Sequence, residues 1–189
     1  MKRKFWSIIS IILLSTMIVS CNKEELEDPY VVFEFRLDCP SALLKYATPQ
    51  VTYKGHNEGA ITFTIPESEW TETGISNSMT TVVINGVTVV SEAQKMMRWT
   101  KRVRYDEIPA KDEMTVVYIP KNNVPAGNVS IIDNFEPKIS GELNYWNELG
   151  EMRQLSNDGE NPNVAFGNGT SLADIISKYR NYMSLEVRK

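Results

Sequence analysis

The chain has 189 residues, with 20 lysines and arginines against 24 aspartates and glutamates, which gives a formal net charge of −4. This length is typical of one domain with a sizeable hydrophobic core. The acidic balance argues against nucleic acid as a partner, because proteins that bind nucleic acid carry a basic patch or stripe. It also argues against direct binding to anionic lipid surfaces.

The first twenty residues have the pattern of a secretory signal peptide. Lys2, Arg3 and Lys4 are followed by an apolar run from Phe5 to Val19 that only serines and a threonine interrupt. The run is shorter than the roughly 20 apolar residues that a transmembrane helix needs. We predict that residues 1–20 are removed, which leaves 17 basic against 24 acidic residues. An uncleaved anchor helix is the less favoured alternative.

The signal ends in Ile18-Val19-Ser20-Cys21, which resembles the lipobox of bacterial lipoproteins. In that family signal peptidase II cuts before the cysteine, whose thiol carries a diacylglycerol. Two or three acyl chains, such as palmitate, anchor a protein stably, since each buried methylene contributes about 0.8 kcal/mol. The resemblance implies that Cys21 is a lipid attachment site and that the membrane is a partner through this anchor. Val19 is bulkier than the alanine or serine usual there.

Residues 21–29 form an acidic segment, with four acids after Cys21 and Asn22. Such a segment cannot build a core, so we predict a solvated tether. The run also resembles the signal that follows the lipid cysteine in Bacteroidetes lipoproteins sent to the outer face of the outer membrane. That resemblance implies a lipid-anchored outer-membrane protein that faces the cell exterior. A plain charged linker is the alternative.

Residues 30–147 carry the signals of a β domain. From Tyr30 to Cys39 apolar residues alternate with polar ones, which predicts a half-buried strand. The alternation places Cys39 on the apolar face as a buried thiol. With Cys21 lipidated, no disulfide can form within the chain, so the fold must depend on packing.

A first hairpin is predicted from Val51 to Ile65. Its strands flank the turn Gly55-His56-Asn57-Glu58-Gly59, which has turn composition. The turn carries the only histidine, which we interpret as a solvated loop residue. A metal site would need further ligands.

A second hairpin is centred on Asn85-Gly86. This pair favours a two-residue type I′ turn, because both positions need positive φ. The turn predicts Ile84 opposite Val87 and Val82 opposite Val89, with these four side chains on one face.

Further strands are expected at Val103–Tyr105, Met114–Ile119, Val129–Ile131 and Ile139–Tyr145. About eight strands with turns every 8–12 residues are typical of an antiparallel β-sandwich, Ig-like or related. The sequence pattern leaves the sheet topology undetermined.

Residues 148–189 are predicted to form a polar loop and a C-terminal helix packed on the sandwich. Gly150–Thr170 is rich in glycine and asparagine. The helix is expected at Ser171–Met183, where apolar residues recur with helical spacing and Ser171 with Asp174 resembles a capping box. A helix on the membrane surface is less favoured, because only Lys178 and Arg180 add positive charge.

A looser resemblance covers Ala42 to Lys121. The stretches ALLKYATPQVTYKG and RWTKRVRYDEIPAKDEMTVVYIPK are similar to small β-rich lipoproteins of gut Bacteroidetes. The resemblance implies the same location and an Ig-like or related sandwich. Most such proteins have no assigned function, so it implies no site residues.

The sequence predicts a non-enzymatic protein without a cofactor, because we find no catalytic triad, zinc spacing or phosphate loop in it. Trp70 and Trp146 lie in or beside polar segments and are the candidate ligand-binding residues, since exposed aromatics often mark recognition sites. Trp99 is expected in the core.

These observations favour a binding or adhesion module displayed at the cell surface, with a glycan or a protein as the ligand. The alternative is a structural or assembly subunit of the cell envelope or of a fimbria-like complex. Nucleic acid is not an expected partner.

Overall fold

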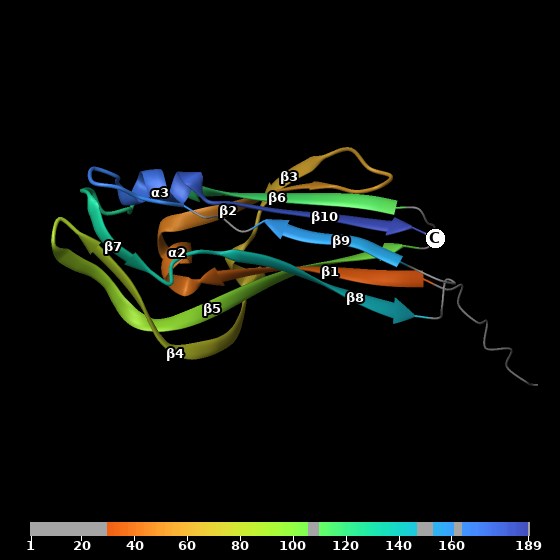
Figure 1. Ribbon diagram of the computed structural model, residues 1–189, viewed down its shortest axis with the longest axis horizontal. Coiled ribbons are helices and arrows are strands. Elements are labelled where there is room, and N and C mark those ends of the chain that lie inside the picture. The colour runs from red at the N-terminus through yellow and green to blue at the C-terminus, as the bar shows by residue number, and fades with distance from the viewer. Residues whose placement is uncertain (1–29, 106–109, 147–152, 161–163, 189) are drawn as a thin grey trace, which may run out of the picture.

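The computed structural model describes residues 30–105, 110–146, 153–160 and 164–188. These residues form ten strands in two five-stranded antiparallel sheets, with short helical segments between them (Figure 1). The first sheet has the order β7-β4-β5-β1-β8 and the second the order β3-β2-β6-β10-β9. The strands are β1 (Tyr30–Pro40), β2 (Ala47–Lys54), β3 (Ile61–Thr64), β4 (Thr71–Ile84), β5 (Val87–Tyr105), β6 (Ala110–Pro120), β7 (Val129–Asp133), β8 (Lys138–Trp146), β9 (Arg153–Glu160) and β10 (Arg180–Arg188). The helical segments are α2 (Ser41–Tyr46), the 3₁₀ turn η1 (Glu67–Glu69) and α3 (Leu172–Lys178).

The prediction of a mostly β protein in antiparallel sheets with a small helix is confirmed. No helix within the described ranges is long and apolar enough to cross a membrane. Cys21, residues 1–20 and the acidic tether 21–29 lie outside the described residues.

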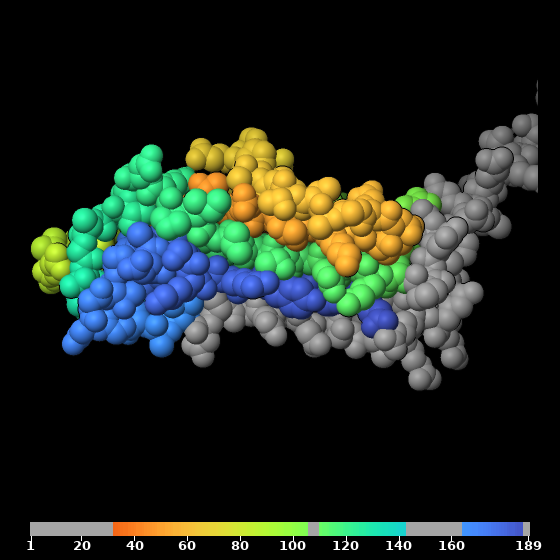
Figure 2. Space-filling model, turned by 90° about the horizontal axis from the view of Figure 1, so that it is seen from above, coloured from red at the N-terminus to blue at the C-terminus, as the bar shows by residue number. Residues whose placement is uncertain are grey.

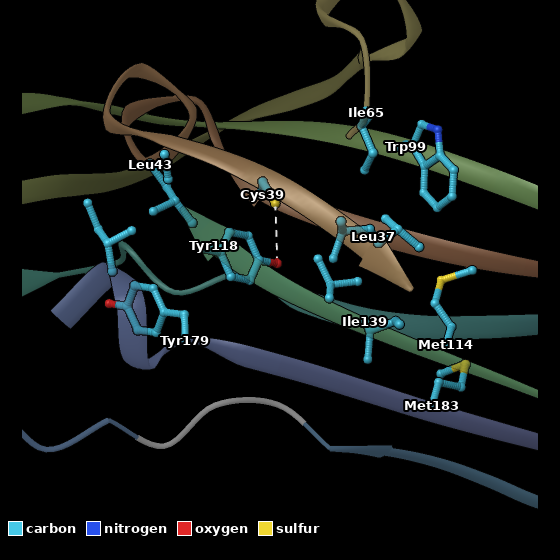
Figure 3. Packing of buried hydrophobic residues seen from close by; sticks show 14 of the residues in the cluster. Leu37, Cys39, Leu43, Ile65, Trp99, Met114, Tyr118, Ile139, Tyr179 and Met183 are labelled. Carbon is cyan, nitrogen blue, oxygen red and sulfur yellow. Dashed lines mark hydrogen bonds between the residues drawn. The ribbon is translucent and has the colours of Figure 1, made fainter. Parts of the chain in front are cut away.

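One core joins the inner faces of the two sheets. The alternation of β1 buries its apolar side chains, and those of β6 and β10 pack in the same cluster (Figure 3). Each such side chain contributes about 1.5–3 kcal/mol on burial. Cys39 is fully buried, as predicted, and its Sγ lies 3.8 Å from the hydroxyl of Tyr118. Burial raises the pKa of the Cys39 thiol, so the thiol stays protonated.

The Asn85-Gly86 turn is confirmed, with φ of 49° at Asn85 and 77° at Gly86. Ile84 pairs with Val87 as predicted. The predicted pairing of Val82 with Val89 is wrong, because a bulge lets Val82 pair with Val90 instead. The bulge moves Val90 to the buried face. Val87, at the turn, is 64% exposed although its partner Ile84 is buried.

The first hairpin is also confirmed, since Val51 of β2 pairs with Phe63 of β3. The strand expected at Val103–Tyr105 is the end of β5, which continues through several register shifts from Val87. Trp99, on the same strand, is 5% exposed and belongs to the core, as predicted.

The C-terminal helix starts where predicted but ends early. The Ser171 hydroxyl accepts a hydrogen bond from the Asp174 N–H at 3.1 Å, which caps α3. The prediction that the helix runs to Met183 is wrong, because α3 ends at Lys178 and β10 follows. In β10 alternate side chains are buried, so Met183 and Leu185 enter the core by strand spacing rather than by helix spacing.

Two strands of the second sheet, β9 and β10, come from residues that were expected to form a loop or a helix. β10 lies between β6 and β9, and β9 comes from the polar segment 153–160. Figure 2 shows the outer face of this sheet, where β10 (blue) runs beside β6 (green) and α3 lies at one end.

Gly141 is the position in β8 where the core tolerates no side chain. A Cβ placed there would lie 2.2 Å from Cζ of Phe33 and 3.1 Å from Sδ of Met183. We expect Gly141→Ala to lower the free energy of unfolding by about 1–3 kcal/mol, because the buried Phe33 ring must shift. Urea denaturation measures the change.

Gly59→Ala is the matched control, because a Cβ at Gly59 would have no neighbour within 4 Å. Equal midpoints for the two variants would contradict the prediction.

Candidate functional site

A groove of about 740 Å³ lies beside α2 and is lined by residues of both sheets. Its wall includes Leu44 of α2, Ile65 after β3, and Met97 of β5. These segments are far apart in the sequence. α2 follows the end of β1, which pairs with β5 at Met97, and precedes β2, which pairs with β3, so the three segments meet. A concave site with an apolar wall and a few polar groups is the usual form of a ligand site.

Trp70 gives the groove its aromatic surface. It follows η1, is partly buried, and packs against the core while it lines the groove. Ile75 of β4 lies on the same wall and is 65% exposed. The predicted ligand-binding residue Trp70 is thus in a concave, accessible position.

The rim of the groove carries paired charges. Lys45 Nζ lies 2.6 Å from Glu92 Oε2, and Lys121 Nζ lies 3.7 Å from Glu67 Oε1. Lys121 also donates to the backbone oxygen of Leu44 at 2.8 Å. Exposed ion pairs of this kind contribute little to stability. Their donors and acceptors can therefore exchange partners with a polar ligand at small cost.

Trp146 is not part of this groove in the fold. Trp146 ends β8 and pairs with Tyr30 at the start of β1. On the other side of β1, Asp38 pairs with Arg98 of β5. Arg98 pairs with Thr71, the residue next to Trp70. Eight residues of strand separate the two positions along β1, roughly 26 Å. The side chain of Trp146 lies outside the described residues.

A second cluster surrounds Asp112 of β6, which the sequence analysis did not single out. Its carboxylate is fully buried and accepts hydrogen bonds from the hydroxyl of Tyr53 at 2.5 Å and of Tyr105 at 2.7 Å. The backbone N–H of His56 donates to it at 2.8 Å. Burial, and next the hydrogen bond to Asp112, raise the pKa of both tyrosines above the ordinary value.

His56 lies in an exposed turn, as expected, but its side chain also contacts Asp112. Its Nδ1 lies 3.3 Å from Asp112 Oδ1, and its side chain is only 23% exposed. The cluster ties the β2–β3 turn to β5 and β6. In the part of the chain that the structure describes, no three His, Cys, Asp or Glu side chains form a group that could hold a metal ion.

One signal in the sequence could have identified Asp112. Strand alternation that starts at Ala110 and continues through Met114, Val116 and Tyr118 puts Asp112 on the buried face. The predicted strand began at Met114, two residues too late to include it.

The tyrosines of this cluster predict a loss of stability at high pH. In the folded chain Tyr53 and Tyr105 keep their protons, whereas tyrosines of the unfolded chain ionise near pH 10, so the free energy of unfolding should fall as pH rises above about 10. Tyr105→Phe removes one such group, so the free energy of unfolding of this variant should fall less steeply with pH than that of the wild type. At neutral pH this variant should lose about 1–3 kcal/mol, because Asp112 loses a donor.

Urea unfolding at several pH values from about 8 to about 11 measures both effects. Parallel pH curves for the variant and the wild type would contradict the prediction.

Comparison with known proteins gives the chain no family. No protein-family model matches it, and no curated protein or solved structure is significantly similar to it. The groove at Trp70 and the cluster at Asp112 are therefore interpreted from their own chemistry. Of the two, the groove is accessible to a ligand, whereas the Asp112 carboxylate is buried.

Proposed function

We propose that this chain is a β-sandwich protein that binds a glycan in the groove at Trp70, as a non-enzymatic binding or adhesion module on the cell surface. We propose that a lipid on Cys21 anchors the protein in the outer membrane. The lipobox-like sequence and the acidic tether support this anchor. The observation that carries the proposal is the partly buried tryptophan in a groove with a charged rim.

The chemistry of the groove suits a sugar. Sugar rings have an apolar face that stacks on an aromatic side chain and hydroxyls that hydrogen-bond at the edge. Trp70 and Met97 supply the apolar contact, while Lys45 and Glu92 supply a donor and an acceptor at the rim. A partly packed tryptophan loses little conformational entropy when it binds.

The position of the groove also suits display. β1 begins at Tyr30, directly after the predicted tether, and ends beside α2, which lines the groove. Its eleven residues separate tether and groove by roughly 36 Å of strand. Figure 1 shows α2 in the half of the domain away from the start of β1, so a lipid on Cys21 would leave the groove on the side away from the membrane.

A specific observation favours assembly as a second function. β7 is an edge strand of the first sheet, and its Ile131, 45% exposed, pairs with Val83 of β4. Exposed apolar side chains at a sheet edge are a surface on which another chain can add a strand.

Trp70→Ala is the test of the glycan site. We expect the variant to lose at least roughly 30-fold in affinity for any uncharged polysaccharide that binds the wild type, because truncation of a tryptophan hot spot costs about 2 kcal/mol or more. Titration of purified protein with a broad panel of uncharged polysaccharides, followed by tryptophan fluorescence and calorimetry, measures the affinity.

Tyr182→Ala is the matched control, because Tyr182 is a half-buried aromatic residue of β10, away from the groove. The same loss in both variants, or a wild type that binds nothing in the panel, would count against the glycan site.

The predicted location is tested separately. We expect a non-permeant protease added to intact cells to cut the wild-type domain, because the anchored domain would face outward. Blotting for the C-terminal strand β10 detects the cut, and Cys21→Ala, which removes the lipid attachment site, is the control. A domain that survives until the outer membrane is opened faces the periplasm, and assembly in the envelope would then be favoured over glycan binding.

A further inference from the structure

The outer face of the first sheet carries arginines on a chain that is acidic overall. Residues paired directly across an antiparallel sheet point to the same side of the sheet. The strand register therefore shows which residues of β5, β1 and β8 form each row of this face. One row is Arg98–Asp38–Lys138, the next Thr100–Arg36–Ser140, and the next Arg102–Glu34–Glu142. Arg104 continues the series on β5. We call these residues the arginine face.

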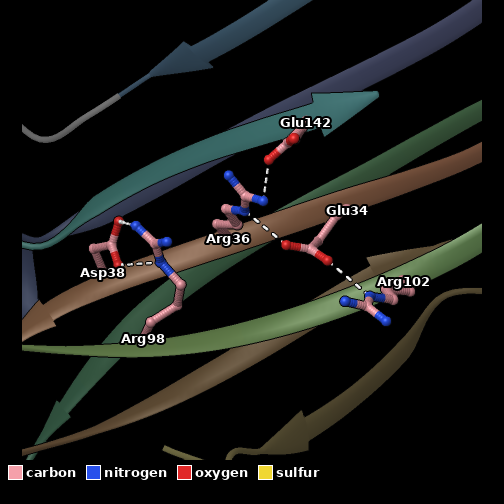
Figure 4. A network of polar contacts seen from close by, with 6 residues as sticks. All are labelled: Glu34, Arg36, Asp38, Arg98, Arg102 and Glu142. Carbon is pink, nitrogen blue, oxygen red and sulfur yellow. Dashed lines mark hydrogen bonds and ion pairs between the residues drawn. The ribbon is translucent and has the colours of Figure 1, made fainter. Parts of the chain in front are cut away.

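Carboxylates hold the guanidiniums of Arg36, Arg98 and Arg102 in place (Figure 4). The Asp38 carboxylate accepts hydrogen bonds from Nε and Nη2 of Arg98 at 2.8 and 2.9 Å. The Glu34 carboxylate accepts hydrogen bonds from Nε of Arg36 and from Nε of Arg102, both at 2.7 Å. Arg36 also forms an ion pair with Glu142. The guanidiniums are therefore oriented before any ligand arrives.

The carboxylates in the central strand lie deeper than the arginines that they hold. The Glu34 side chain is 9% exposed and that of its partner Arg102 is 75% exposed. The Asp38 side chain is 18% exposed and that of Arg98 is 35% exposed. Burial opposes ionisation of Glu34, but hydrogen bonds from Arg102 and Arg36 hold the pKa of this carboxyl below its ordinary value. Over β1 and β5, solvent thus meets guanidiniums above less exposed carboxylates, whereas Glu142 of β8 is 45% exposed and its partner Arg36 is 28% exposed.

Stability alone does not account for this arrangement. An ion pair with a mostly exposed arginine contributes about 0–1 kcal/mol. Arg102 uses its Nε on Glu34, so the outer edge of its guanidinium remains directed to solvent. A planar guanidinium with free N–H groups matches a carboxylate or a sulfate.

A shallow hollow of about 360 Å³ adjoins the face. Arg98 and Thr100 line it from β5, and Thr71 and Thr73 line it from β4. Trp99 and Glu69 complete the lining, and the Trp99 Nε1–H donates to the Glu69 carboxylate at 2.8 Å. The hollow thus offers hydroxyls next to a guanidinium. Ser140 offers another hydroxyl in the same row as Arg36.

We propose that the arginine face is a second binding surface, separate from the groove at Trp70, and that it binds a linear polysaccharide bearing carboxylate or sulfate groups. Arg98, Arg102 and Arg104 lie four and then two residues apart on one face of β5, roughly 14 and 7 Å, and this row of cations suits a linear polyanion. The hydroxyls suit the sugar hydroxyls between its charges. The carboxylates between the arginines would repel a polyanion with a higher charge density, such as nucleic acid.

The face and the groove lie on opposite sides of β5. Met97 lines the groove, and Trp99 enters the core, while Arg98 and Thr100 alternate with them on the outer side. A ligand on one surface therefore does not occupy the other. The proposal stands or falls independently of the glycan site at Trp70.

The test uses the full chain in non-ionic detergent and heparin as the probe, with alginate as a probe that carries carboxylates only. Arg102→Gln is expected to weaken heparin binding roughly tenfold at low salt, because one charge-assisted contact is lost. The slope of log affinity against log salt should fall by about one unit. Arg102→Lys, which keeps the charge, should retain most of the affinity.

Lys111→Gln is the matched control. Lys111 lies on β6 of the other sheet, is 55% exposed, and pairs with Glu113 at 2.7 Å, as Arg102 pairs with Glu34 at 2.7 Å. Both variants remove one exposed positive charge, and circular dichroism verifies that both fold. Lys111→Gln should bind heparin like the wild type, and so should Trp70→Ala.

Three results would overturn the proposal. One is that neither heparin nor alginate binds the wild type. Another is an equal loss in Arg102→Gln and Lys111→Gln, which would mean that net charge alone is sensed. The last is binding to phosphatidylglycerol vesicles without binding to either polysaccharide, which would make the face a membrane contact. Alginate binding equal to heparin binding identifies carboxylate as the sufficient group and supports the proposal.

Discussion

Every second residue of β1 points into the space between the two sheets, and the residues between them point outward. Phe33, Phe35 and Leu37 on the inner side are fully buried and join the sheets. Glu34 and Asp38 on the outer side hold the arginines of β5. Because the period of a strand is two, a slip of one residue would expose the aromatic rings and bury the carboxylates. The core and the arginine face thus depend on the same register.

Polar groups inside the core restrict the alignment of the second sheet. The Tyr118 hydroxyl donates to Asn181 Oδ1 at 2.6 Å, and Asn181 donates to the backbone oxygen of Pro137 at 3.3 Å. Asp112 is held by two tyrosine hydroxyls and a backbone N–H. A buried polar group without its partner costs about 1–3 kcal/mol, so these contacts penalise any other strand alignment. Within the described residues, no buried side-chain nitrogen or oxygen lacks a hydrogen-bond partner.

The local signals predicted local structure well, and the errors came from long-range contacts. Asn85-Gly86 predicts its turn because both residues must adopt positive φ, but the adjoining bulge depends on how β4 and β5 pair. The start of α3 follows from the Ser171 cap, whereas β10 was missed because Asn181 interrupts its apolar alternation. Trp70 was identified as a candidate from its polar surroundings. The groove was not, because its wall comes from segments far apart in the chain.

The long strand β5 connects the two proposed surfaces. Its inward residues reach the groove and the core, and its outward residues form the arginine face. Since the backbone separates the two faces of the strand, changes on opposite faces should act additively when separate ligands bind. A coupling between Trp70 and Arg102 in a double-mutant cycle would instead mean that one chain of sugar passes around the strand edge and contacts both. The polysaccharide would then be a single extended ligand, and its affinity would depend on both contacts together.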